Sequence, residues 1–170
     1  GTTGTLNLGN ATTDSLTFTG GLTHVAGSTT LSADLSSDGA INFNHLTIKN
    51  TATIDSGDKA TSTIRAGQIV LGEDQSLTIG TDNSTAAVSF YAATANAPSS
   101  GIVSDLTINT SGTVSVVNNI GASNGNIDQL LIDNATTIHI GGDITANRVA
   151  ITDFSGASLT FTGGISGNTS

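Results

Sequence analysis

Residues 140–145 read Ile-Gly-Gly-Asp-Ile-Thr, and residues 161–166 read Phe-Thr-Gly-Gly-Ile-Ser, 21 positions further along the chain. A third similar stretch, Phe-Thr-Gly-Gly-Leu-Thr, occupies residues 18–23. In each copy a glycine pair lies between two apolar positions, without the two long flanking strands of a β-hairpin. Such internal similarity at a regular spacing is typical of a repeat architecture.

Short tripeptides with apolar ends and a small or polar centre fill the intervals between these copies. Their alternation has a period of two, which predicts half-buried β-strands. Clusters such as Asn124-Gly125-Asn126 separate them and allow positive φ and tight turns. No window has the amphipathic pattern of a capped helix, so we expect almost no helix. The tripeptides begin at Leu16, Ile41, Leu46, Ile69, Leu77, Leu106, Val114, Ile138, Val149 and Leu159.

The spacing of these strands predicts the fold. Ile132 and Ile151 are 19 residues apart, and Ile54 and Ile79 are 25 residues apart. A loose period of this size, with three strands in each interval, describes a right-handed parallel β-helix, a β-solenoid. We predict one all-β segment over residues 1–170, with about eight coils of roughly 20–25 residues and three short strands per coil. The structural alternative is a sandwich or barrel, which has longer strands, typically of about five or six residues.

The composition agrees with stacked coils. The 170-residue chain has a net charge of −9, yet only 10% of its residues are charged. Like charges on successive coils would repel, whereas Thr, Ser and Asn can line an outer face without net charge. Four Lys and Arg residues are too few for the basic stripe that binds nucleic acid. There is no Cys, and no apolar run approaches the roughly 20 residues of a membrane-spanning helix.

The Leu-Thr-Phe-Thr-Gly-Gly motif at residues 159–164 and Ile-Gly-Gly-Asp-Ile-Thr-Ala-Asn at residues 140–147 resemble the passenger regions of bacterial autotransporter adhesins. The large rickettsial surface antigens are most similar, and filamentous-haemagglutinin-type repeats are also similar. The resemblance covers residues 16–164. It implies an exported rod on the bacterial cell surface, used for adhesion or as a surface layer.

Catalysis is the main functional alternative, because several β-helix families are polysaccharide lyases or hydrolases. A glycosidase needs two carboxylates that converge across one bond. The acidic residues here are scattered and mostly flank Gly or Ser, as turn-forming Asp does. A groove that gathers Asp residues from consecutive coils beside Arg65 or Arg148 would instead indicate an enzyme. The closest pairs of acids in the sequence are Asp55 with Asp58, Glu73 with Asp74, and Asp128 with Asp133.

Metal sites and histidine chemistry are not predicted. His24, His45 and His139 lack a metal-ligand spacing, and alternation points His139 outward. The calcium β-roll repeat is absent, because the glycine pairs lack the required third glycine. The turn at residues 55–58 is the one place where an opportunistic ion could bind. We therefore expect no catalytic residue, no cofactor and no metal ion.

We predict a non-enzymatic, extracellular structural or adhesive rod from a bacterial adhesin, surface layer or filament. Its expected partners are cell-surface glycans or proteins, or copies of itself stacked end to end, with no nucleic acid and no membrane insertion. Because neither end shows a polar cap, we expect the segment to continue in a longer chain or to stack. Besides the enzyme, an ice-binding solenoid is an alternative, because Thr-x-Thr pairs occur at positions such as Thr17 and Thr19.

Overall fold

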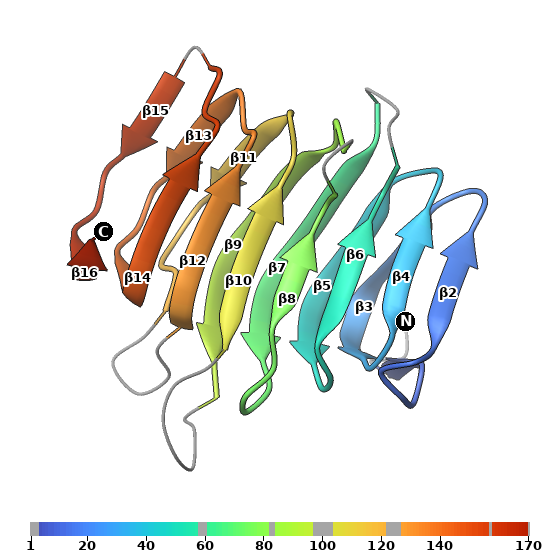
Figure 1. The fold of residues 1–170 in the computed structure, drawn as a ribbon. Helices are drawn as coiled ribbons and strands as arrows, with labels where there is room; N and C mark the ends of the chain where they lie inside the picture. The colour runs from blue at the N-terminus through green and yellow to red at the C-terminus, as the bar shows by residue number, and fades with distance from the viewer. Residues whose placement is uncertain are drawn as a thin grey trace.

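The computed structural model describes residues 4–57, 61–81, 84–96, 104–121, 127–156 and 158–169. These residues form two eight-stranded sheets in which every strand pair is parallel, and they contain no helix. Parallel neighbours need a crossover and exclude the hairpins of a sandwich or barrel. The predicted β-solenoid is therefore confirmed (Figure 1).

One sheet contains the odd-numbered strands: β1 (Thr5–Leu8), β3 (Leu22–Leu31), β5 (Ile41–Ile48), β7 (Thr63–Leu71), β9 (Ala87–Ala95), β11 (Thr113–Val116), β13 (Thr137–Ile140) and β15 (Ser158–Phe161). The other contains the even-numbered strands: β2 (Ser15–Phe18), β4 (Asp34–Ser37), β6 (Ala52–Asp55), β8 (Leu77–Ile79), β10 (Asp105–Asn109), β12 (Ile127–Asp133), β14 (Ile144–Thr152) and β16 (Ile165–Thr169).

The coil length varies along the chain, and this corrects the predicted number of coils. Ile132 pairs with Ile151 and Ile54 pairs with Ile79, which confirms both spacings taken from the sequence. Ile79, however, pairs with Ile108, 29 residues further on. The solenoid therefore has about six turns, and not the eight that a uniform shorter period predicts.

Each coil has three faces, but two of the three apolar segments usually belong to one strand. In β5, Ile41–Phe43 lies on the first face and His45–Ile48 on the second, while β6 lies on the third. We call the bends between successive faces the first, second and third corners. Because one ladder continues around a corner, the strands reach ten residues where we expected cores of about three.

The copies of the glycine-pair motif do not all lie at the same corner. Ile140 pairs with Phe161, and Ile144 pairs with Ile165, so these two copies stack directly at the first corner. The third copy, at residues 18–23, joins β2 to β3 and lies at the third corner. It is a similar local turn but is not in register with the other two.

The inward side chains form continuous apolar columns. Leu35, Ile54, Ile79, Ile108 and Ile132 are successive ladder partners on the third face, and each is at most 1% exposed. Burying each such side chain contributes about 1.5–3 kcal/mol. Leu16 and Leu22 near one end of the stack, and Ile151 and Phe161 near the other, pack against this core but are only partly buried.

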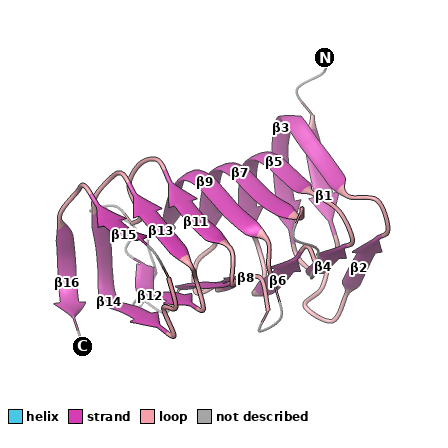
Figure 2. Ribbon diagram, turned by 90° about the horizontal axis from the view of Figure 1, so that it is seen from above, coloured by secondary structure: helices cyan, strands magenta, loops and turns pink. Residues whose placement is uncertain are grey.

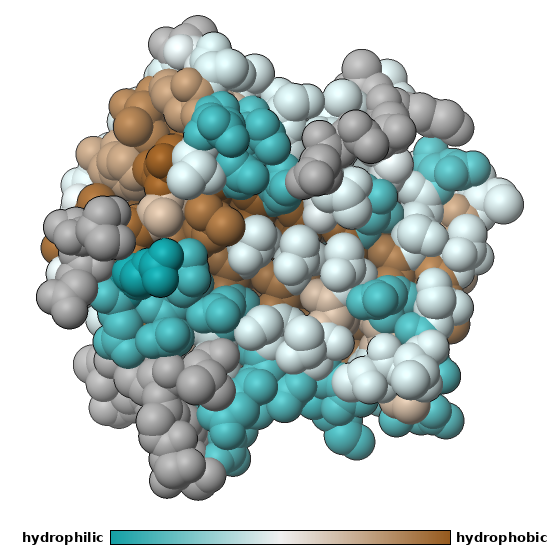
Figure 3. All heavy atoms as spheres, in the orientation of Figure 1, coloured by the Kyte–Doolittle hydropathy of each residue, from teal (hydrophilic) through white to brown (hydrophobic). Residues whose placement is uncertain are grey.

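Outward polar side chains link one coil to the next. Thr17 Oγ1 lies 3.1 Å from Ser36 Oγ, and Asn134 Nδ2 donates to Asn109 Oδ1 at 3.0 Å. The face shown in Figure 3 is largely hydrophilic or neutral, and apolar side chains gather toward its C-terminal end. No helix that could cross a membrane occurs among the described residues.

Candidate functional site

The first corner carries an open groove where β3, β5, β7 and β9 run side by side (Figure 2). Alternation along β5 and β7 buries Ile41 and Ile64 and turns Asn42 and Arg65 outward. Asn42, Arg65 and Ser89 are ladder neighbours, so they form one outward row with a repeat of about 4.8 Å. This row is one side of the groove.

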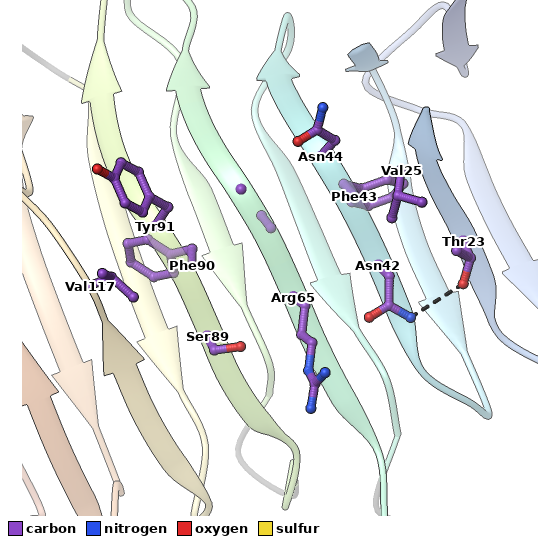
Figure 4. Close-up of a pocket in the computed structure, with 12 residues that line it drawn as sticks. Thr23, Val25, Asn42, Phe43, Asn44, Arg65, Ser89, Phe90, Tyr91 and Val117 are labelled. Atoms are coloured by element: carbon purple, nitrogen blue, oxygen red, sulfur yellow. Dashed lines mark hydrogen bonds between the residues drawn. The ribbon is translucent and has the colours of Figure 1, made fainter. Parts of the chain in front are cut away.

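The groove has a volume of about 520 Å³. Its floor lies at Gly67, where the bend of β7 carries no side chain (Figure 4). A Cβ built at Gly67 would overlap the backbone carbonyl oxygen of Asn44 in the coil below, so close stacking of the coils requires glycine here. The groove is lined by Thr23, Val25, Asn42, Phe43, Asn44, Arg65, Ala66, Gly67, Ser89, Phe90, Tyr91 and Val117.

Apolar side chains flank the floor on both sides. Val25 is 59% exposed, Tyr91 is 53% exposed and Val117 is 63% exposed. Asn118 Nδ2 donates to the Tyr91 hydroxyl at 3.1 Å, which fixes the end of the ring. Of the five most exposed large apolar side chains among the described residues, three therefore line this one groove. A cluster of this kind indicates a binding surface.

The polar lining contains one cation and no acid. Asn42 Nδ2 donates to Thr23 Oγ1 at 3.2 Å, which orients the amide within the groove. The exposed Arg65 side chain forms no hydrogen bond or ion pair with any other described residue. An unpaired guanidinium in a chain with a net charge of −9 is a local site for an anion.

The carboxylates chosen from the sequence do not form the predicted pairs. Asp55 accepts hydrogen bonds from Gly57 N at 3.1 Å and Thr81 Oγ1 at 3.5 Å, as a turn residue does, and Asp58 lies outside the described residues. Asp74 has a positive φ of 56° in the turn before β8. Asp128 and Asp133 lie near opposite ends of β12, where Asn147 Nδ2 donates to Asp128 and Thr152 Oγ1 donates to Asp133.

A different carboxylate cluster lies at the second corner. Asp105, Gln129 and Arg148 are successive ladder partners, and Asp128 is adjacent to Gln129 in the chain. Burial raises the pKa of Asp105, and the negative charge of Asp128 raises it further; the Gln129 backbone N–H and the Arg148 charge oppose this rise in pKa. The sequence interpretation missed Asp105 because it paired acids by closeness in the chain, whereas coil spacing would have placed Asp105 in line with Arg148.

The histidines lie at separate places. His139 is exposed on β13, as alternation predicts. His24 is half-buried, with Nδ1 2.9 Å from the hydroxyl of the buried Thr29, and His45 is exposed at the first corner. Within the described parts of the chain, no three His, Cys, Asp or Glu side chains are placed to hold a metal ion.

A threonine column on the third face is short. Thr53, Thr78 and Thr107 are ladder partners, but the next two positions are Leu131 and Ala150. An ice-binding surface needs threonine at the same position in every coil, and this column supplies it in only part of the stack.

Comparisons of the chain with protein-family models, with curated proteins and with solved structures found no match. The fold defines the chain as a β-solenoid repeat protein.

Proposed function

We propose that the chain is a non-enzymatic, extracellular adhesive segment: a rigid β-helical rod of a bacterial cell-surface adhesin, surface layer or filament. The uninterrupted column from Leu35 to Ile132 carries this proposal. Such a column, together with parallel ladders between all coils, fixes each coil on its neighbours. The sequence resemblance to autotransporter passengers supports the same class.

The outer surface suits weak contacts that act in large numbers. Hydroxyls and amides line the outward rows, and the groove at the first corner adds an aromatic ring and an unpaired cation. Individually weak contacts give strong attachment when many copies are presented together. The groove is therefore the candidate contact site for cell-surface glycans or proteins.

Attachment of the chain to beads tests the adhesive function. Beads that carry many copies of the chain should adhere to cell surfaces, whereas beads coated with a globular protein of the same net charge should not. Soluble chain should compete only weakly, because multivalency is lost in the monomer. If the coated beads adhere no better than the control beads, the proposed function is wrong.

End-to-end stacking of copies is a second part of the proposal. Leu159 is 46% exposed and Ile165 is 44% exposed, so the C-terminal coil presents apolar surface. We expect the mass measured by light scattering to rise with protein concentration, and Ile165→Lys to suppress this rise. A constant monomer mass over the whole range would contradict stacking.

The cluster at the second corner supports one rival function, a carbohydrate-active enzyme. Two carboxylates from consecutive coils, Asp105 and Asp128, lie beside Arg148, and the raised pKa of Asp105 suits a general acid. The Arg148 charge could neutralise an acidic sugar. Incubation with a polyuronate, followed by a reducing-end assay, tests this function. Cleavage that Asp105→Asn abolishes and Arg65→Gln preserves would establish it over the adhesive rod.

A further inference from the structure

We infer that the groove at the first corner binds a carboxylate-bearing sugar residue of a glycan, with the Arg65 guanidinium as its anchor. This inference rests on the proposed adhesive function and names the ligand class of its contact site. Three features of the groove carry it: the charge of its only cation, the chemistry of its polar row, and the exposed face of its aromatic ring.

Charge complementarity selects a carboxylate. Arg65 is the only charged residue that lines the groove, and it has no ion-pair partner among the described residues. A guanidinium presents a planar fork that matches the two oxygens of a carboxylate. Because no acidic side chain lines the groove, nothing there competes with the ligand for this fork.

The neighbours of Arg65 match sugar hydroxyls. Asn42 and Ser89 flank Arg65 in the same outward row, and Asn44 is exposed beside the groove floor. An amide supplies both donors and an acceptor, and a serine hydroxyl does both as well. Figure 4 shows Asn42 and Ser89 on either side of Arg65, with Asn42 held by Thr23.

Tyr91 supplies the apolar part of the site. The ring is 53% exposed, and its hydroxyl accepts a hydrogen bond from Asn118 Nδ2. It therefore offers a fixed, flat surface at small entropic cost. A pyranose has C–H groups on its ring faces and hydroxyls around its edge, so it can pack on Tyr91 while its edge faces the polar row.

The ladders argue against a peptide as the occupant. β7 is paired with β5 on one side and with β9 on the other, so the groove has no free strand edge. An extended peptide could not add to the sheet there and would lose the backbone hydrogen bonds that carry most peptide recognition of this type. Side-chain recognition of a sugar needs no such edge.

The test measures binding of a glucuronate-containing tetrasaccharide and of its methyl ester by NMR titration of the folded chain. We expect a Kd of about 0.1–1 mM for the free acid, as for a shallow and open site, with shifts at Arg65, Ser89 and Tyr91. Arg65→Gln should weaken binding at least about tenfold, and Arg65→Lys should weaken it less. Tyr91→Ala should weaken it about fivefold, and Tyr91→Phe less than about twofold.

Two controls separate the specific contact from general charge. Lys49→Gln removes the same charge from an exposed position outside the groove and should change Kd less than about twofold. The methyl ester should bind wild type as weakly as the free acid binds Arg65→Gln, and Arg65→Gln should weaken ester binding no further. Thermal melting shows whether each variant remains folded.

Three outcomes would overturn the inference. The first is equal binding of the free acid and the ester. The second is equal weakening by Arg65→Gln and Lys49→Gln. The third is tighter, Arg65-dependent binding of a Glu-rich hexapeptide, which would make the groove a peptide site. If the coated beads adhere and Arg65→Gln beads adhere equally well, the inference fails while the adhesive function stands.

Discussion

The first corner of the solenoid is built in two ways along the chain. In the N-terminal half, the inward residues on either side of this corner are three positions apart, as Phe43 and Leu46 are in β5. In the C-terminal half they are four positions apart, as Ile140 and Ile144 are, and the ladder stops between β13 and β14. One residue therefore decides whether the strand continues.

The second corner shows the reverse arrangement. Ile127 and Leu130 are three positions apart, and β12 is continuous between them. Ile48 and Ala52 are four positions apart, and they end β5 and begin β6. A single extra residue bends a strand and keeps its ladder, as a β-bulge does, whereas two extra residues make a turn. β3 is the exception, because it crosses the first corner with a register shift between His24 and Ser28.

This difference explains where the groove lies. The tight first corner in β5, β7 and β9 leaves room for only two outward residues, and one of them is Gly67 in β7. The three-residue turns of the later coils place backbone over the same position. The comparison thus assigns the contact site to the half of the molecule whose first corner is continuous.

The largest expected effect tests whether the two halves differ in their cores as well as at their corners. Ile69→Ala in the N-terminal half and Ile138→Ala in the C-terminal half each remove a side chain that is at most 1% exposed. Each should lower the free energy of unfolding by about 2–5 kcal/mol, measured by urea denaturation. Val117→Ala, at a 63% exposed position, should change it by less than about 0.5 kcal/mol. A large difference between the two core variants would extend the comparison to the interior.

Corner glycines should have the next largest effect, and in both halves. A Cβ at Gly67 would overlap the Asn44 carbonyl, and a Cβ at Gly142 would overlap the backbone of Asn118. Gly67→Ala and Gly142→Ala should each lower the unfolding free energy by about 1–3 kcal/mol. Gly20→Ala is the matched control, since a Cβ there would meet no atom within 4 Å. Equal stability of all three variants would mean that coil stacking does not depend on these contacts.

A one-residue insertion tests the spacing rule itself. A glycine inserted between Gly67 and Gln68 changes the spacing from three to four and should break the ladder at the first corner. We expect faster hydrogen exchange at the Gln68 and Ile69 amides and a loss of about 1–2 kcal/mol, because a few ladder hydrogen bonds are lost. The same insertion between Gly141 and Gly142 enlarges an existing turn and should cost only a few tenths of a kcal/mol. Unchanged exchange in the first variant would refute the rule.

The smallest effect concerns pH at the second corner. Because the folded state raises the pKa of Asp105, folding favours its protonated form, and stability falls as pH rises from the ordinary carboxyl range to the raised value. Asp105→Asn should therefore raise Tm at neutral pH, by less than about 0.5 kcal/mol in stability for a largely solvated group. The gain should vanish at acidic pH, where Asp105 is protonated in both states. The exposed Asp38→Asn controls for the loss of one charge, and a gain that persists in acid would contradict the charge argument.

The sequence predicts the parallel stack well, because the alternation of apolar residues and the spacing from Ile132 to Ile151 depend only on local pattern. It misjudges the number of turns, because the corner between Ala95 and Leu106 inserts far more chain than the period allows. The spacing rule at the corners was readable, since Phe43 and Leu46 differ visibly from Ile140 and Ile144. It gains meaning only when the faces are known.

Neither candidate site could be found from closeness in the chain. Val25, Tyr91 and Val117 come from three different coils and meet only because the first corner aligns them. Asp105 and Arg148 are likewise brought into line by two successive ladders. In a solenoid, residues cooperate at distances of one coil length, and that length is the quantity that the variable corners conceal.

The direction of the ladder bonds has a mechanical consequence. In this stack the backbone hydrogen bonds connect one coil to the next, so tension between the two ends pulls the coils apart along those bonds. The half-buried outer coils would detach first, one at a time, while the interior stays folded. Leu71 and its partner Ala95 are 24 residues apart, and a released coil of that length lengthens the tether by about 80 Å. The molecule would then yield in steps under load, as a shock absorber does, and re-form when the force is removed.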